Sequence, residues 1–129
     1  MTAFRMPVGD KPVDNFHAGG IAAGVSEDGV LSTARMLDVG GGIYTHHPST
    51  GTGIEGCTLP HYKDLVTLAL SAHRVFREFK AVGWDLVLVE SGPSILEGNL
   101  GWCTSIIQMT NEIPLGLTDY PRIFVENLK

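Results

Sequence analysis

The stretch that decides the fold is VGWDLVLVESGPSILEGN, residues 82–99. Two apolar runs, Asp85–Glu90 and Ser94–Gly98, flank a Ser-Gly-Pro segment rich in turn-forming residues, and this pattern predicts a β-hairpin. Acidic residues stand at the beginning of the first strand and near the end of the second. A hairpin that served burial alone would not need carboxylates at those positions, so they mark either an exposed strand end or a site.

Alternation of side chains along a strand places Glu97 and Asn99 on one face. A turn with an odd number of residues would bring Asp85 to the same face of the neighbouring strand. Two carboxylates and an amide would then converge, and oxygen donors of this kind suit Mg²⁺ or Mn²⁺. The E-x-N pattern is short, so an exposed strand end with weakly repelling charges stays open as the alternative.

The remaining sequence predicts an α+β fold in a single domain covering residues 1–129. We expect a strand over Thr2–Val8 and a hairpin turn at Asp28-Gly29. A long helix is expected after Pro60, and a short C-terminal helix over Asp119–Leu128, both packed with an antiparallel β-sheet. The apolar positions that define the long helix recur every three or four residues: Leu65, Leu68, Ala69, Ala72, Val75, Phe76 and Phe79.

Charge and cysteine content exclude several classes of protein. The formal net charge is −5, with 9 basic and 14 acidic residues and no basic cluster, so nucleic acid is not an expected partner. The two cysteines, Cys57 and Cys103, form no zinc or disulfide pattern. No membrane-spanning run and no signal peptide are recognisable, which favours a cytoplasmic location. Because neighbouring side chains of an extended segment point apart, His46 and His47 are interpreted as part of a polar loop.

Four motifs in a fixed order give the sequence a specific resemblance: DNFHAGGIAAGV, HPSTG, GWDLVL and LEGN. The acidic residue, hairpin and E-x-N resemble the magnesium-binding end of the ATP-grasp superfamily. The DNFHAGG segment is similar to the N-x-H-x-G-G loop of its glutamate-ligase branch. In this combination the chain most resembles the C-terminal part of the sugar-transfer associated ATP-grasp group, from Arg5 to about Asn99.

The resemblance implies a role for each matching residue. Asp85, Glu97 and Asn99 would bind the metal. Asn15 and His17 would lie beside the triphosphate as catalytic and nucleotide-binding residues, with Gly19 and Gly20 allowing close approach of the backbone. Arg5 resembles the arginine placed near the γ-phosphate or acyl phosphate. The glutamate-ligase branch has a second arginine where this chain has Val13, so the source of the phosphate-stabilising cation stays open.

The implied activity is that of an ATP-dependent carboxylate–amine ligase with an acyl-phosphate intermediate, using ATP and Mg²⁺ or Mn²⁺. The lysines of this chain match none of the superfamily's adenine-binding motifs, so we expect a C-terminal portion that lacks the N-terminal ATP-binding part and is inactive alone. Its partners would be ATP, a carboxylate and amine substrate pair, and the missing subdomain or a second copy. Two alternatives stay open: a non-catalytic binding module, and another Mg²⁺-dependent phosphoryl-transfer enzyme.

Overall fold

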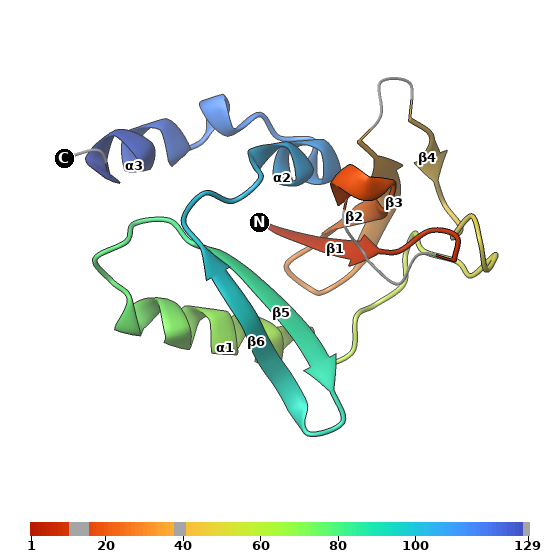
Figure 1. Ribbon diagram of the computed structural model, residues 1–129, viewed down its shortest axis with the longest axis horizontal. Coiled ribbons are helices and arrows are strands. Elements are labelled where there is room, and N and C mark those ends of the chain that lie inside the picture. Colours follow the sequence, from red (N-terminus) through yellow and green to blue (C-terminus); the bar gives the residue numbers. More distant parts are fainter. Residues whose placement is uncertain (11–15, 38–40, 128–129) are drawn as a thin grey trace. The chain divides into compact units, whose positions relative to one another are not determined.

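The computed structural model describes residues 1–10, 16–37 and 41–127 (Figure 1). The chain forms two compact units. The first contains Met1–Leu59 and Thr104–Ile113, and the second contains Pro60–Cys103 and Pro114–Lys129. Both contain antiparallel strands and helices, which confirms the predicted α+β class.

The first unit is built on a four-stranded antiparallel sheet in the order β1-β2-β3-β4. The strands are β1 (Thr2–Met6), β2 (Ile21–Val25), β3 (Leu31–Met36) and β4 (Ile43–Tyr44). The predicted turn between β2 and β3 is confirmed, because the Gly29 amide donates to the Ser26 carbonyl at 3.0 Å. Gly29 has a φ of 83°, a left-handed conformation that glycine adopts without steric cost. β1 ends at Met6, two residues before the end that the sequence pattern predicted.

Helix α2 (Thr104–Asn111) packs on this sheet at β2, whose five residues are all buried. The close approach depends on Gly24, where a Cβ atom would lie only 2.4 Å from the carbonyl oxygen of Thr110. The β2–β3 register shifts at this point, and the Gly24 amide donates instead to the Ser32 hydroxyl at 2.9 Å. The sequence analysis did not predict α2, because eight residues rich in Thr and Ile give little helical signal.

The second unit combines a two-stranded hairpin with helices. Its elements are α1 (Tyr62–Val75), β5 (Gly83–Val89), β6 (Gly92–Asn99), the 3₁₀ turn η2 (Leu115–Leu117) and α3 (Tyr120–Asn127). The long helix and the C-terminal helix are therefore confirmed, and α1 packs along β5 and β6. The prediction that Val75 belongs to the packed face of α1 is wrong: it is 74% exposed, because the helix ends there and Phe76 leaves helical geometry.

Aromatic rings connect the segment after β6 to α3 within the second unit. The ring centroids of Trp102 and Tyr120 lie 5.2 Å apart in an edge-on arrangement, and Tyr120 lies 6.1 Å from Phe124. Such edge contacts stabilise aromatic clusters beyond their buried area. Trp102 thus has a packing role.

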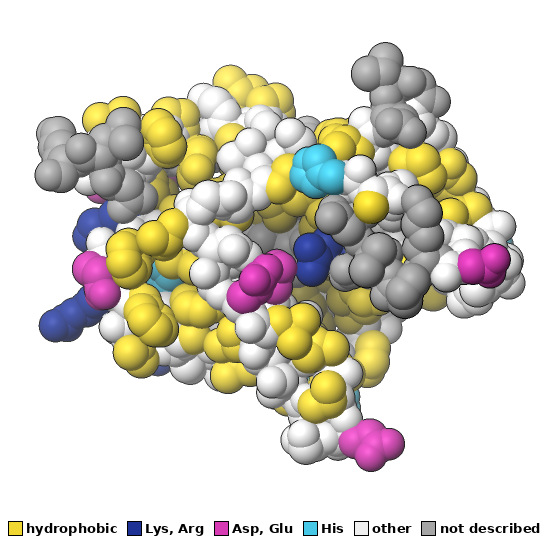
Figure 2. Space-filling model, in the orientation of Figure 1, with side chains coloured by type: hydrophobic (Ala, Val, Ile, Leu, Met, Phe, Trp, Pro, Cys, Tyr) yellow, Lys and Arg dark blue, Asp and Glu magenta, His cyan; other side chains and the backbone are white. Residues whose placement is uncertain are grey.

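Hydrophobic side chains also reach the surface, where Figure 2 shows them spread between rather few charged groups. In the second unit Leu70, Leu96 and Leu117 are each more than half exposed, and α1 contains no fully buried residue. A helix and a hairpin alone bury too little surface to form a strong core. The second unit therefore has apolar surface that its own elements leave uncovered.

Candidate functional site

The β5–β6 hairpin brings Asp85 and Glu97 directly opposite each other. Near the turn the ladder is regular, with Val89 opposite Gly92 and Leu86 opposite Ile95. The register then shifts by one residue, so that Leu96 has no partner in the ladder and Glu97 faces Asp85. In a continuous ladder Leu96 would lie opposite Asp85, and Glu97 would point to the other face.

The sequence analysis expected this opposition from an odd-numbered turn, and that expectation was wrong in its cause. Pairing of Val89 with Gly92 leaves a two-residue turn, Glu90-Ser91, in place of the expected Ser-Gly-Pro loop. The bulge at Leu96 supplies the odd offset instead. The predicted arrangement of the two carboxylates is nevertheless the one observed.

Asn99 completes the cluster on the same face as Glu97. Its Nδ2 atom donates a hydrogen bond to Oε1 of Glu97 at 3.0 Å, which leaves its amide oxygen available for another interaction. Glu97 is exposed, whereas Asn99 and Asp85 are half-buried. Two carboxylates and one amide oxygen are thus presented from neighbouring positions of a hairpin.

Position 98, between Glu97 and Asn99, has no room for a side chain on the opposite face of the hairpin, so glycine fits there. It pairs with Trp84, and a Cβ atom at Gly98 would lie 2.7 Å from the Trp84 ring. The indole also contacts Phe76 at the end of α1, with ring centroids 5.9 Å apart. Packing on this face therefore fixes the strand that carries the polar groups, as a rigid site requires.

The donor set fits a hard divalent cation. Within residues 1–10, 16–37 and 41–127, no three His, Cys, Asp or Glu side chains group closely enough to hold a metal ion. The hairpin offers Asp85, Glu97 and the oxygen of Asn99, which is a partial set of oxygen ligands. Mg²⁺ retains several water molecules and uses one or two carboxylates plus phosphate oxygens, so a partial protein set is what it needs. Zn²⁺, which prefers thiolate and imidazole, is a poor match.

The predicted phosphate loop lies in the first unit, just before β2. Asn15 is outside the described residues. His17 is exposed within a single 3₁₀ turn, η1 (Phe16–Ala18), which is anchored by the buried Phe16. Gly19 has a φ of 92°, and a Cβ atom added there would meet nothing within 4 Å, whereas Gly20 is buried. The loop therefore exposes an imidazole and an unobstructed stretch of backbone.

Arg5 lies on β1 opposite Ala22 of β2, and Ala22 lies opposite Arg35 of β3. The two arginines thus occupy one cross-strand row, separated by a small, fully buried residue. Arg35 forms an ion pair with Glu112. The sequence analysis singled out Arg5 and missed Arg35. The turn at Asp28-Gly29 alone would not have revealed Arg35, because the register shift between Ala23 and Val25 is what brings Arg35 opposite Ala22.

Comparison with known families bears on this combination of glycine loop and acidic hairpin. The model of the sugar-transfer associated ATP-grasp family matches residues 1–118, which include strands β1 to β6. The chain belongs to this ATP-grasp family. Searches of curated proteins and of solved structures gave no significant match.

Membership agrees with the architecture: antiparallel sheets with three helices are consistent with the C-terminal subdomain of an ATP-grasp fold. It also supports an ATP-binding, ligase-like module. In the part of the chain that the structure describes, no helix is long and apolar enough to span a bilayer. The cytoplasmic location stays a prediction.

Proposed function

We propose that this ATP-grasp chain is the Mg²⁺–ATP-binding portion of a carboxylate–amine ligase that acts through an acyl phosphate. The observation that carries the proposal is the opposition of Asp85 and Glu97, with Asn99 bonded to Glu97. Membership of the ATP-grasp family supports nucleotide binding.

The hairpin would provide the oxygen ligands for Mg²⁺ or Mn²⁺. Asp85 and Glu97 would contribute anionic oxygens, and Asn99 would contribute its amide oxygen. When bound, the cation would neutralise phosphate charge during phosphoryl transfer. Clustering two carboxylates without a cation is unfavourable, and the metal would relieve that repulsion.

The glycine loop would bind phosphate. His17 and the amide groups near Gly19 and Gly20 are donors that can hold an anion in a protein of net negative charge. Asn15 and Arg5 are proposed to take part as the family resemblance implies, with Arg5 offering a permanent positive charge to the transferred phosphoryl group. Arg35 joins the proposal as a second candidate cation.

The overall reaction would proceed in two steps. A substrate carboxylate oxygen bonds to the γ-phosphorus of ATP and ADP leaves, giving an acyl phosphate. An amine then attacks the acyl carbon, phosphate leaves, and the ammonium product loses a proton to form the amide. We further propose that the chain operates as the C-terminal part of a larger ATP-grasp domain, completed by an N-terminal subdomain or by a second copy.

The proposal is tested with the full-length gene product by trapping with hydroxylamine. An acyl phosphate reacts with hydroxylamine to give a hydroxamate, so ATP and a competent carboxylic acid should yield hydroxamate and ADP in equal amounts. Glu97→Gln should abolish this product, and Glu90→Gln, which changes a carboxylate at the hairpin turn, should preserve it. ADP without hydroxamate from any acid in a carboxylate panel would indicate another phosphoryl-transfer reaction. Metal and ATP binding without any turnover would indicate a binding module.

A further inference from the structure

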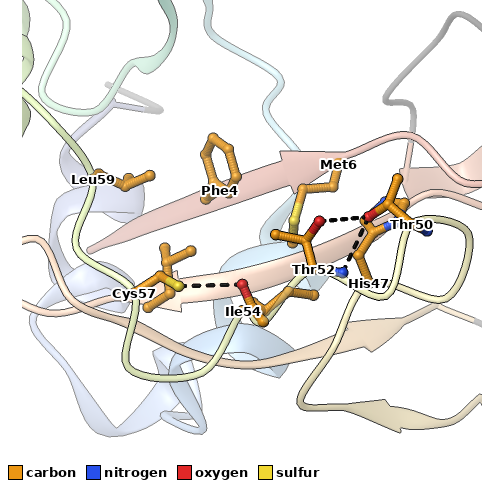
Figure 3. Close-up of a pocket in the computed structure, with 10 residues that line it drawn as sticks. Phe4, Met6, His47, Thr50, Thr52, Ile54, Cys57 and Leu59 are labelled. Atoms are coloured by element: carbon orange, nitrogen blue, oxygen red, sulfur yellow. Dashed lines mark hydrogen bonds between the residues drawn. The ribbon is translucent and has the colours of Figure 1, made fainter.

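The first unit contains a pocket that the proposed ligase site does not use. It has a volume of about 290 Å³ and lies between β1 and the segment that follows β4 (Figure 3). Its walls are mainly apolar, and its lining residues are Phe4, Met6, Leu31, His47, Thr50, Thr52, Gly53, Ile54, Cys57 and Leu59. All ten belong to the first unit, so the pocket is complete within it.

Fixed contacts hold the loop that forms one wall. The Nε2 atom of His47 donates to the carbonyl oxygen of Pro7 at 2.8 Å, which ties the loop to the end of β1. Its Nδ1 atom accepts from the amides of Ser49 and Thr50, each at 3.3 Å. Because a carbonyl can only accept, Nε2 carries the proton of the bond to Pro7. These contacts fix the loop that forms this wall of the pocket.

The polar groups at the pocket are few. The hydroxyl oxygens of Thr50 and Thr52 lie 2.9 Å apart and share one hydrogen bond, so this contact uses only one of the two hydroxyl protons. The Cys57 thiol donates to the carbonyl oxygen of Gly53 at 3.2 Å. Among the residues that the structure describes, no Asp, Glu, Lys or Arg lines the pocket. The pocket therefore favours a mainly apolar ligand, to which one hydroxyl group can donate a hydrogen bond.

The size of the pocket favours a small molecule. An enclosed apolar cavity of about 150 Å³ is enough to bind benzene, and this pocket, which is open to solvent, has nearly twice that volume. Phe4, although 36% exposed, contributes an aromatic face to the wall. A recess lined by apolar and aromatic side chains with a few polar groups is typical of small-molecule sites.

We propose that this pocket binds an uncharged small molecule with one ring or a branched alkyl group and a carbonyl oxygen. The apolar part would contact Met6, Leu31 and Ile54, and the carbonyl would accept the Thr52 hydroxyl proton. This inference does not rest on the proposed ligase function, because binding requires neither ATP nor metal.

Two probes of matched shape test the proposal: acetophenone, which has a carbonyl, and α-methylstyrene, which has a methylene in its place. With ¹³C-methyl labelling, both probes should shift the signals of Met6, Ile54 and Leu59 at millimolar concentrations or below. The methyl signals of Leu68 and Leu70 on α1 serve as controls and should not move. Shifts that are equal at both sets of methyls, or absent throughout, would overturn the proposal.

Thr52→Val tests the polar contact. It should weaken acetophenone binding about fivefold, the effect of one neutral hydrogen bond, and leave α-methylstyrene binding unchanged. Thr67→Val on α1 is the matched control and should change neither affinity. Equal affinity of acetophenone for the wild-type chain and Thr52→Val would remove the carbonyl from the proposal's ligand and so contradict it.

Alkylation of Cys57 gives an independent measurement. Bound acetophenone should slow modification of Cys57 by iodoacetamide, as followed by peptide mass mapping, while Cys103 in the same chain provides the internal control. Cys57→Phe should occupy the mouth of the pocket and abolish the methyl shifts caused by both probes. Unchanged Cys57 reactivity under saturating probe, or undiminished shifts in a folded Cys57→Phe chain, would place the probes elsewhere.

Discussion

Asp85 of β5 lies directly opposite Glu97 of β6 because a single unpaired residue, Leu96, shifts the register between them. The relation places two carboxylates on one face of a hairpin whose other face is packed through Trp84 against Phe76. Strand β5 therefore contributes Trp84 to the packed face of the hairpin and Asp85 to its polar face.

Deletion of Leu96 should preserve the opposition of Asp85 and Glu97. Without the extra residue the regular ladder that runs from the turn would pair Asp85 with Glu97. Leu96 is 65% exposed, so little packing is lost. Because the proposed ligands keep their positions, we expect the deletion variant to retain Mn²⁺ affinity in the presence of ATP within about threefold, which corresponds to ~0.7 kcal/mol. Paramagnetic broadening of hairpin amides provides the measurement, and its disappearance in a folded variant would contradict the prediction.

Gly98→Ala should destabilise the chain, because its new methyl group would meet the Trp84 ring at 2.7 Å. Overpacking of this kind costs about 1–3 kcal/mol in the free energy of unfolding. Gly101→Ala is the matched control: a Cβ there meets no atom within 4 Å, and we expect a change within about 0.5 kcal/mol. Urea denaturation measures both. Equal stability of the two variants would show that Trp84 moves aside freely.

Glu97→Gln should separate metal binding from stability. It removes one of the proposed anionic ligands, so Mg²⁺ or Mn²⁺ binding in the presence of ATP should be lost. The amide oxygen of Gln can still accept the hydrogen bond from Asn99, and repulsion from Asp85 is relieved. The melting temperature should therefore stay the same or rise slightly. Retention of full metal-dependent activity would remove Glu97 from the metal site.

The hairpins were predictable from sequence because their signals are local. Asp28-Gly29 marks one turn, and the two apolar runs that flank the Ser-Gly-Pro segment mark the other hairpin. The bulge at Leu96 was not predictable, because nothing in the sequence distinguishes an unpaired leucine from a paired one. The face shared by Asp85 and Glu97 was obtained by assuming an odd turn, although the odd residue lies elsewhere.

Features that depend on contacts between residues far apart in the sequence were harder to predict. Helix α2 is specified by its fit to Gly24 and Ser32, about eighty residues earlier in the chain, more than by its own periodicity. The pocket beside β1 requires the loop held by His47, whose partner at Pro7 is forty residues away. The sequence interpretation of His47 as a polar loop residue was compatible with this role but could not reveal it.

The glycine loop provides the final prediction, which concerns nucleotide binding. Gly20 is buried, so its substitution would disturb folding and binding together. Gly19 gives a cleaner test, because it has positive φ and open space around a Cβ position, and Gly9 shares both properties. Alanine at either position should cost a similar amount of stability, about 1 kcal/mol, from the left-handed conformation.

If the loop binds phosphate, the two variants should differ in their effect on ATP. In the full-length gene product, Gly19→Ala should raise the KM for ATP about tenfold, equivalent to ~1.4 kcal/mol, because the backbone amides there would lose their approach to the anion. Gly9→Ala should leave that KM within about twofold, which is below ~0.5 kcal/mol. Steady-state kinetics and thermal unfolding of both variants provide the comparison. Equal KM values, with equal losses of stability, would mean that the loop is an ordinary turn before β2 and that phosphate binds to other residues.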